Sequence, residues 1–221
     1  YLADLGPDDD MFDDVGVTGM HGAERVIFSD ETPADVIALE ATLVGYQEAR
    51  FPSTEAEAKA FKEELLAKIV ADAQRLKEQW VPANIDLPGA FTGLVDLMNE
   101  QREKVNKAAS QEQESRYSQR TMADLRANLE GTRKIYAVFQ PWLQSLEGGA
   151  AIDTRIEAGF SNLESVYETV EGDAIPDPPS DWSAESPSEE NLVTPFGKLY
   201  KAVGDAVDPN QDGSIVAEMT E

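Results

Sequence analysis

The sequence predicts an all-α protein. Alanine, leucine and glutamate are frequent in its 221 residues, and no β-branched run alternates with period two. Apolar residues instead recur at steps of three and four, the spacing that places side chains on one face of a helix. A chain of this length can bury one sizeable core, and nothing in its composition requires a second one. We therefore predict a single helical domain over residues 1–221.

Charge and cysteine content exclude several classes of function. The chain has 43 acidic and 18 basic residues, a formal charge of −25, which repels nucleic acid and anionic lipid. It has no cysteine, which excludes thiol catalysis, thiolate metal sites and disulfides. No stretch approaches the roughly 18–20 apolar residues of a membrane span, and no signal peptide is visible. Because the numbering opens at Tyr1 within an acidic segment, we expect a leader, and a first helix, to precede it.

The N-terminal part is predicted to be an acidic lead-in followed by two short helices. Residues 1–14 are rich in aspartate, and negative charge before a helix suits the helix dipole. The first helix is expected over about 15–29. Thr32 as the capping residue and Pro33 at the first helical position predict a second helix, which runs to about residue 47.

Two longer helices are predicted next. Ser53-Thr54 starts one that ends before Pro82, and another runs from about Pro88 to Ala109. We expect their apolar faces to be core. These faces contain Phe61, Leu65, Ile69, Ala73, Leu76 and Trp80 in the first helix, and Phe91, Leu94, Met98 and Val105 in the second.

A further helix is predicted from Glu114 to Leu146, with Pro141 expected to kink or end its regular part. Its packing face contains Met122, Leu125, Leu129, Tyr136, Phe139, Leu143 and Leu146. Beside that face lie small residues and one carboxylate, Glu130. Small residues let another helix approach closely, so Glu130 either points into the bundle interior or is an ordinary surface glutamate.

The C-terminal part begins at Gly148-Gly149, which we expect to end the preceding helix. Another helix follows, to about Glu171. Residues 173–190 are rich in proline and acid, and we predict an ordered crossover over the bundle that Trp182 holds in place. Thr194-Pro195 caps a last helix to about Val207.

The only histidine of the chain suggests its chemistry. His21 and Glu24 are three residues apart, so they share a helix face, on which Val17 and Phe28 also fall. A carboxylate buried on such a face needs a cation or a hydrogen-bond partner. A metal ion would satisfy both side chains, and a purely structural ion pair is the alternative. One imidazole with carboxylates suits a single iron, zinc or calcium ion, whereas a zinc protease motif would need a second histidine.

A second acidic motif lies near the C-terminus. Residues 208–215 reproduce the opening of an EF-hand loop, with oxygen-bearing side chains at positions 1, 3 and 5 and glycine at position 6. Position 12, which carries the bidentate glutamate, is Met219 here. Glu218 and Glu221 are out of register, so the pattern is closer to an acidic turn than to a calcium loop.

Three sequence blocks resemble a known family. Gly19-x-His21-x-x-Glu24, then Arg116-Tyr117-Ser118, and then the stretch Asp124–Gly131 (DLRANLEG) follow in this order. Together they resemble the imelysin-like family, which includes insulin-cleaving-peptidase-like proteins and Efe-type periplasmic iron-uptake components. The likeness covers about residues 15–170.

The resemblance implies an up-and-down helical bundle of imelysin type, exported and often lipid-anchored, with a metal near His21 and Glu24. It also implies Glu130 as a ligand from a distant helix and an aspartate soon after the motif, Asp35 or alternatively Asp30. The implied function is a periplasmic or envelope-associated protein that holds iron or zinc for metal uptake alongside other envelope iron-uptake components. A metallopeptidase of the same family is the enzyme alternative, although no general base can be identified, and an interaction module with a structural His/Glu pair is the third.

Overall fold

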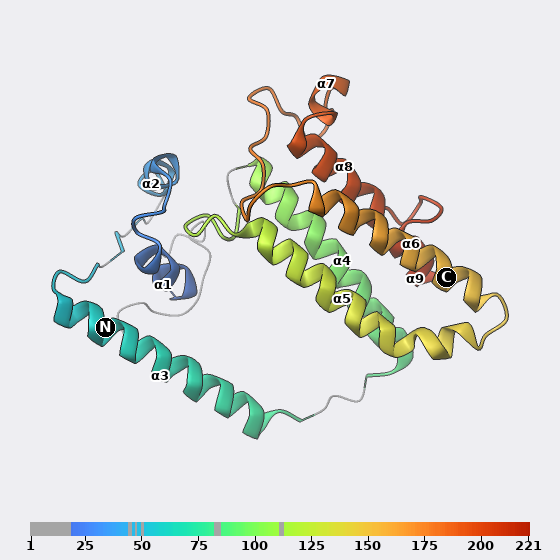
Figure 1. The fold of residues 1–221 in the computed structure, drawn as a ribbon, viewed down its shortest axis with the longest axis horizontal. Helices are drawn as coiled ribbons and strands as arrows, with labels where there is room; N and C mark the ends of the chain where they lie inside the picture. Colours follow the sequence, from blue (N-terminus) through green and yellow to red (C-terminus); the bar gives the residue numbers. More distant parts are fainter. Residues whose placement is uncertain (1–18, 44–45, 47, 50, 82–84, 111–112) are drawn as a thin grey trace. The chain divides into compact units, whose positions relative to one another are not determined.

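The computed structural model describes residues 19–43, 46, 48–49, 51–81, 85–110 and 113–221. Within these ranges it contains helices and no strand, so the all-α prediction is confirmed. The chain divides into two compact units, Tyr1–Asn84 and Ile85–Glu221, which are described separately (Figure 1). The helices are α1 (Gly19–Ile27), α2 (Ala34–Glu40), α3 (Glu55–Gln79), α4 (Leu87–Ala109), α5 (Thr121–Gln144), α6 (Gly149–Glu168), α7 (Glu189–Leu192), α8 (Pro195–Val207) and α9 (Ile215–Thr220).

In the first unit, α1 packs against the beginning of α3. Ala23 and Val26 of α1 are buried with Phe61 of α3, and Phe51 and Leu65 cover this small cluster. The start of α3 is capped as predicted, since the Thr54 hydroxyl accepts a hydrogen bond from the Glu57 amide. The Glu57 carboxylate in turn accepts from the Ser53 amide at 2.7 Å, which completes a reciprocal cap.

The remaining apolar face of α3 is exposed, so the prediction that all of it is core is wrong. Ile69, Leu76 and Trp80 are 50%, 66% and 65% exposed. The three-and-four spacing identifies an apolar face but not what covers it. Among the described residues of this unit, only the cluster around Phe61 packs on α3.

The second helix begins differently from the prediction. The Thr32 hydroxyl donates to the Phe28 carbonyl at 2.9 Å, at the end of the preceding turn, so it does not cap α2. Pro33 occupies the N-cap position without a side-chain hydrogen bond, and α2 ends at Glu40 rather than near residue 47. The predicted stretch 15–18, like the acidic lead-in, lies outside the described residues.

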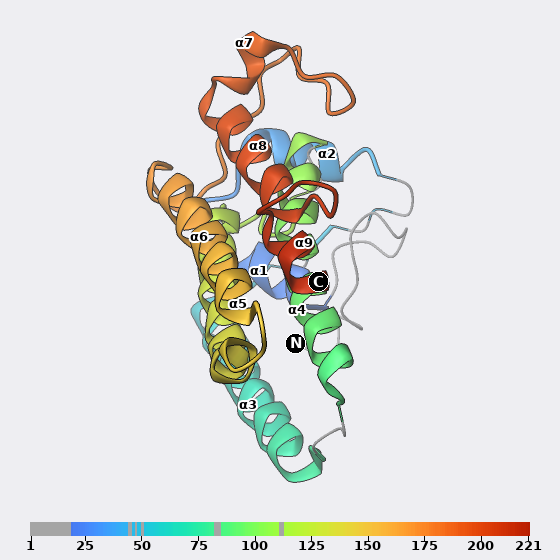
Figure 2. The same cartoon turned by 90° about the vertical axis from the view of Figure 1, so that its right-hand side faces the viewer.

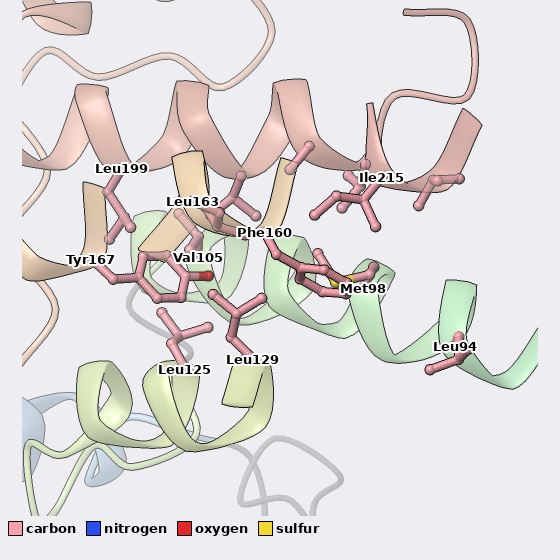
Figure 3. Packing of buried hydrophobic residues seen from close by; sticks show 14 of the residues in the cluster. Leu94, Met98, Val105, Leu125, Leu129, Phe160, Leu163, Tyr167, Leu199 and Ile215 are labelled. Atoms are coloured by element: carbon pink, nitrogen blue, oxygen red, sulfur yellow. The ribbon is translucent and has the colours of Figure 1, made fainter. Parts of the chain in front are cut away.

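The second unit is a bundle with one shared core. Helices α4 and α6 lie between α5 on one side and the pair α8 and α9 on the other, and each packs against both. Figure 2 shows α8 and α9 beside α4. Side chains from α4, α5, α6, α8 and α9 meet in this core, as Figure 3 shows: Met98 and Val105 from α4, Leu125 and Leu129 from α5, Phe160, Leu163 and Tyr167 from α6, Leu199 from α8, and Ile215 from α9.

Helix α5 begins at Thr121, seven residues later than predicted. Residues 114–119 form turns, and Gln119 has a φ of 55°, which an α-helix cannot accommodate. The first amides of α5 find an acceptor elsewhere, because Met122 and Ala123 donate to the Asp173 carbonyl at 2.8 and 3.3 Å. The segment after α6 therefore supplies the N-terminal cap of α5. Pro141 lies inside α5, which continues to Gln144.

The two adjacent glycines begin α6 instead of ending α5. Gly148 has a φ of 79° and stands at the N-cap of α6, a conformation that glycine adopts without strain. A side chain at Gly149 would meet the Leu143 carbonyl oxygen at 1.8 Å, so only glycine fits there. Both residues make the tight turn that brings α6 back along α5.

The Pro-rich segment is an ordered crossover, as predicted. Trp182 packs edge-on against Phe196 and Tyr200 of α8, with ring centroids 4.8 and 4.9 Å apart. Thr194 caps α8 by accepting from the Gly197 amide, which confirms the predicted start of that helix. The short helices α7 and α9 were not predicted. None of the helices in the described ranges is long and apolar enough to cross a membrane.

Candidate metal centre

His21 and Glu24 lie on α1 and face each other, as their spacing predicts. The His21 Nδ1 and Glu24 Oε2 atoms are 3.4 Å apart, and the two side chains are 26% and 17% exposed. The deeply buried face of α1 is the neighbouring one, with Ala23 and Val26, while Ile27 is 54% exposed. The pair therefore borders the packed face of the helix, partly accessible to solvent. The expectation that it lies within the buried stripe is wrong.

A buried ion pair next to this site was not predicted. Arg25 Nε lies 3.3 Å from Glu40 Oε1, and both side chains are buried. The Arg25 guanidinium also stacks over the Phe51 ring at 5.0 Å. The Tyr46 hydroxyl donates to the same Glu40 oxygen, and burial together with that carboxylate raises the pKa of Tyr46. These contacts tie α1 to α2 and fix the helix that carries His21 and Glu24.

The sequence carries only a weak signal for the Arg25–Glu40 pair. An arginine on the packed side of a helix requires a carboxylate partner, because an unpaired buried charge is costly. The chain offers 43 acidic residues. Spacing cannot select Glu40 from among them, since the two residues lie on different helices.

The two candidate aspartates are exposed. Asp35 lies in the first turn of α2, and Asp30 lies in the turn between α1 and α2. Either side chain is free to move in solvent, and the structure does not single out one of them. Asp35 and Asp30 remain alternative predictions for the additional ligand.

Glu130 belongs to the second unit and lies on the exposed side of α5. Its carboxylate pairs with Lys134 one turn later, and that ammonium holds the pKa of Glu130 below its ordinary value. Within its own unit Glu130 is thus a charged surface residue, and the alternative of a surface glutamate is the correct one. That Glu130 joins His21 and Glu24 remains a prediction, because the two units are described separately.

The described side chains around His21 supply only part of the ligands that a metal ion needs. Among the described residues, no three histidine or acidic side chains are grouped so that they could hold an ion. His21 and Glu24 supply one nitrogen and one carboxylate, which suit zinc or iron. A third protein ligand has to come from another carboxylate, for which Asp35, Asp30 and Glu130 are the candidates.

The second and third sequence blocks, residues 116–118 and 124–131, have structural roles in this bundle. Arg126 donates to the carbonyls of Tyr167, Val170 and Gly172 at 3.1, 2.6 and 2.7 Å. It thereby joins α5 to the C-terminal end of α6 and to the residues that follow it. Arg116, Tyr117 and Ser118 are buried in the turns before α5.

The EF-hand-like stretch forms a loop that is held by hydrogen bonds among its own residues and to α9. Gly213, with a φ of 81°, donates its amide to Glu218 Oε1 at 3.1 Å, and the Asp208 carboxylate accepts from the Asn210 amide at 2.9 Å. Glu218 lies in α9, which follows the loop directly. Its carboxylate thus binds the loop backbone.

Comparison with models of protein families identifies the family of this chain. The imelysin model, named as a peptidase family, matches residues 3–202. The chain belongs to the imelysin family. The match includes the His21–Glu24 pair and the block that contains Glu130, and it supports a metal-related or peptidase-like role in general. No curated protein and no solved structure matches the chain.

Proposed function

We propose that this imelysin is an exported metal-binding protein that holds one cation for metal uptake at the cell envelope. The observation that carries the proposal is the His21–Glu24 pair, 3.4 Å apart and half-buried on α1 within the region that the family model matches. An imidazole and a carboxylate in this arrangement can supply two of the protein ligands of a zinc or iron site.

His21 would hold the cation through an imidazole nitrogen and Glu24 through a carboxylate oxygen. One of Asp35, Asp30 and Glu130 would complete the set. The Arg25–Glu40 pair supports the site indirectly, because it lies next to His21 and Glu24 and fixes the orientation of α1. The charge of −25 raises the local concentration of cations around the molecule.

Uptake is favoured over peptide hydrolysis by the chemistry of the residues. A hydrolytic metal site needs an open coordination position and a general base. With a single histidine, the chain cannot form the His-Glu-x-x-His motif of zinc proteases, and the sequence identifies no general base. The partners we propose are the metal ion and other envelope iron-uptake components, with any lipid anchor lying outside these residues.

Metal analysis of purified variants tests the proposal. We expect the natural chain to retain one equivalent of metal and to melt at a higher temperature when it is loaded. A ligand at about 100 times its Kd stabilises the folded state by about 2.7 kcal/mol. His21→Ala and Glu24→Gln should lose both the metal and the stabilisation. Glu31→Gln, an exposed acidic change in the following turn, is the matched control and should keep both.

The alternatives predict different results. A metallopeptidase would cleave a generic protein substrate and lose that activity with a chelator. If neither the natural chain nor the variants bind iron, zinc or calcium, and His21→Ala is merely less stable, the pair is a structural ion pair and the uptake proposal fails. Asp35→Asn, Asp30→Asn and Glu130→Gln, measured in the same way, identify the additional ligand by which of them releases the metal.

A further inference from the structure

A small aromatic pocket lies at one end of the second unit, where α5 turns into α6. Its volume is about 270 Å³. Phe91 of α4 and Trp142 of α5 form one wall, with ring centroids 6.1 Å apart, and Trp142 is 42% exposed. The remaining apolar lining comes from Leu143, Leu146, Ile152 and Met219. The turn at Gly149 holds the ends of α5 and α6 together at this point.

Three carboxylates line the same pocket, those of Glu147, Glu218 and Glu221. One guanidinium partly balances them, since Arg155 Nη2 lies 2.6 Å from Glu218 Oε2 and 3.3 Å from Glu221 Oε2. Glu147 has no ion pair among the residues that the structure describes, and it is exposed. Negative charge is therefore in excess around an apolar cavity.

Glu218 gives the pocket a buried acceptor. It is only 6% exposed, and its Oε1 atom accepts from the Gly213 amide at 3.1 Å. Its Oε2 atom is ion-paired with Arg155 Nη2 at 2.6 Å, a contact without the geometry of a hydrogen bond. Each carboxylate oxygen can accept more than one hydrogen bond, so Glu218 can still accept from a ligand that brings N–H donors.

We propose that this pocket binds a primary ammonium carried on an aromatic or branched apolar group. Aromatic rings such as those of Phe91 and Trp142 attract cations, and the apolar lining accommodates the hydrocarbon part. The carboxylates favour the ammonium and repel anions. A metal ion fits less well, because the three carboxylates do not converge into a group that could hold one. This site is independent of His21 and Glu24.

Calorimetric titration of the full chain with three isosteric probes tests the charge requirement. The probes are phenethylammonium, neutral phenethyl alcohol and anionic phenylacetate. We expect saturable one-to-one binding of phenethylammonium at millimolar concentration and much weaker binding of the other two. If the alcohol binds as tightly as the ammonium, or if the ammonium shows no saturable binding, the proposal is overturned.

Variants test the location of the site. Glu147→Gln removes an exposed charge and should weaken phenethylammonium binding about two- to fivefold. Trp142→Ala should weaken it about three- to tenfold. The matched control Glu168→Gln removes one charge from the far end of α6 and should leave binding unchanged. Equal weakening by Glu168→Gln would show a general charge effect, and unchanged binding in Trp142→Ala would place the ligand elsewhere. Either result overturns the proposal.

Discussion

The Asp153 carboxylate of α6 is buried against α5 and is held there by hydrogen bonds. Tyr136 donates its hydroxyl at 2.6 Å, and the Gln140 and Gln144 amides donate at 3.0 and 2.6 Å. Burial alone would raise the pKa of Asp153, but these three donors outweigh it and hold that pKa below its ordinary value. Burial, together with the Asp153 carboxylate, raises the pKa of Tyr136. A charged carboxylate is thus the stable form in this interface.

Removing this carboxylate should be costly. In Asp153→Ala the Tyr136 hydroxyl, which is fully buried, would lose its acceptor, and we expect a loss of about 1–3 kcal/mol in the free energy of unfolding. Asp205→Ala is the control, because Asp205 pairs with Lys201 on the surface of α8, and its loss should cost under about 1 kcal/mol. Urea denaturation measures both. Equal losses in the two variants would contradict a special role for Asp153.

The lowered pKa of Asp153 also predicts a dependence on pH. A carboxyl group whose pKa is lower in the folded state contributes stability above its unfolded pKa, and this contribution is lost as pH falls through the folded pKa. We expect the free energy of unfolding to fall below about pH 5. In Asp153→Asn this fall should be shallower. A pH profile parallel to that of the natural chain would refute the assignment.

The contact between His21 and Glu24 could be predicted from the sequence. The spacing of His21 and Glu24 predicted their contact, because i and i+3 positions on one helix have a fixed geometry. Contacts between helices could not be predicted in this way. Glu40 as the partner of Arg25 and Asp153 as the acceptor of Tyr136 depend on how helices pack, which one sequence does not specify.

Among the helices, local capping signals predicted the starts of α3 and α8 correctly, but not the cap of α2. Thr54 and Thr194 cap α3 and α8, because the capping signal depends on neighbouring residues alone. The start of α5 was missed, since it depends on the Asp173 carbonyl, about fifty residues further along the chain. Helices α7 and α9, with four and six residues, are too short for apolar periodicity to reveal.

The role of Trp182 in the crossover between α6 and α8 can be tested by mutation. Trp182 connects it to Phe196 and Tyr200 of α8, and Tyr200 donates its hydroxyl to the Ala184 carbonyl at 3.1 Å. We expect Trp182→Ala to lower the free energy of unfolding by about 2–4 kcal/mol and to expose residues 173–190 to protease. Thermal melts and limited proteolysis measure the two effects.

Trp80→Ala makes the same chemical change at the end of α3. Trp80 is 65% exposed, so we expect that variant to change stability by less than about 1 kcal/mol. If both tryptophan variants behave alike, or if the crossover in Trp182→Ala resists protease as before, Trp182 does not hold the crossover in place.

At the scale of the whole molecule, the apolar core lies almost entirely in the second unit. The main cluster runs from Leu94 on α4 to Met219 on α9, and every member belongs to Ile85–Glu221. Among the described residues of the first unit, the buried cluster consists of Ala23, Val26 and Phe61. The single domain expected over residues 1–221 stays a prediction. The spacing of apolar residues in the sequence predicts apolar helix faces, but it does not predict how many separate cores those faces form.

This distribution predicts that Ile85–Glu221 folds by itself. Buried apolar area is the main source of stability, and this segment retains the complete main cluster. We expect the isolated segment to be helical by circular dichroism and to unfold cooperatively. Leu129→Ala within it should lower the free energy of unfolding by about 2–5 kcal/mol, because Leu129 is 1% exposed at the centre of that cluster. A gradual, non-cooperative melt, or a Leu129→Ala variant as stable as its parent, would show that this core depends on the first 84 residues.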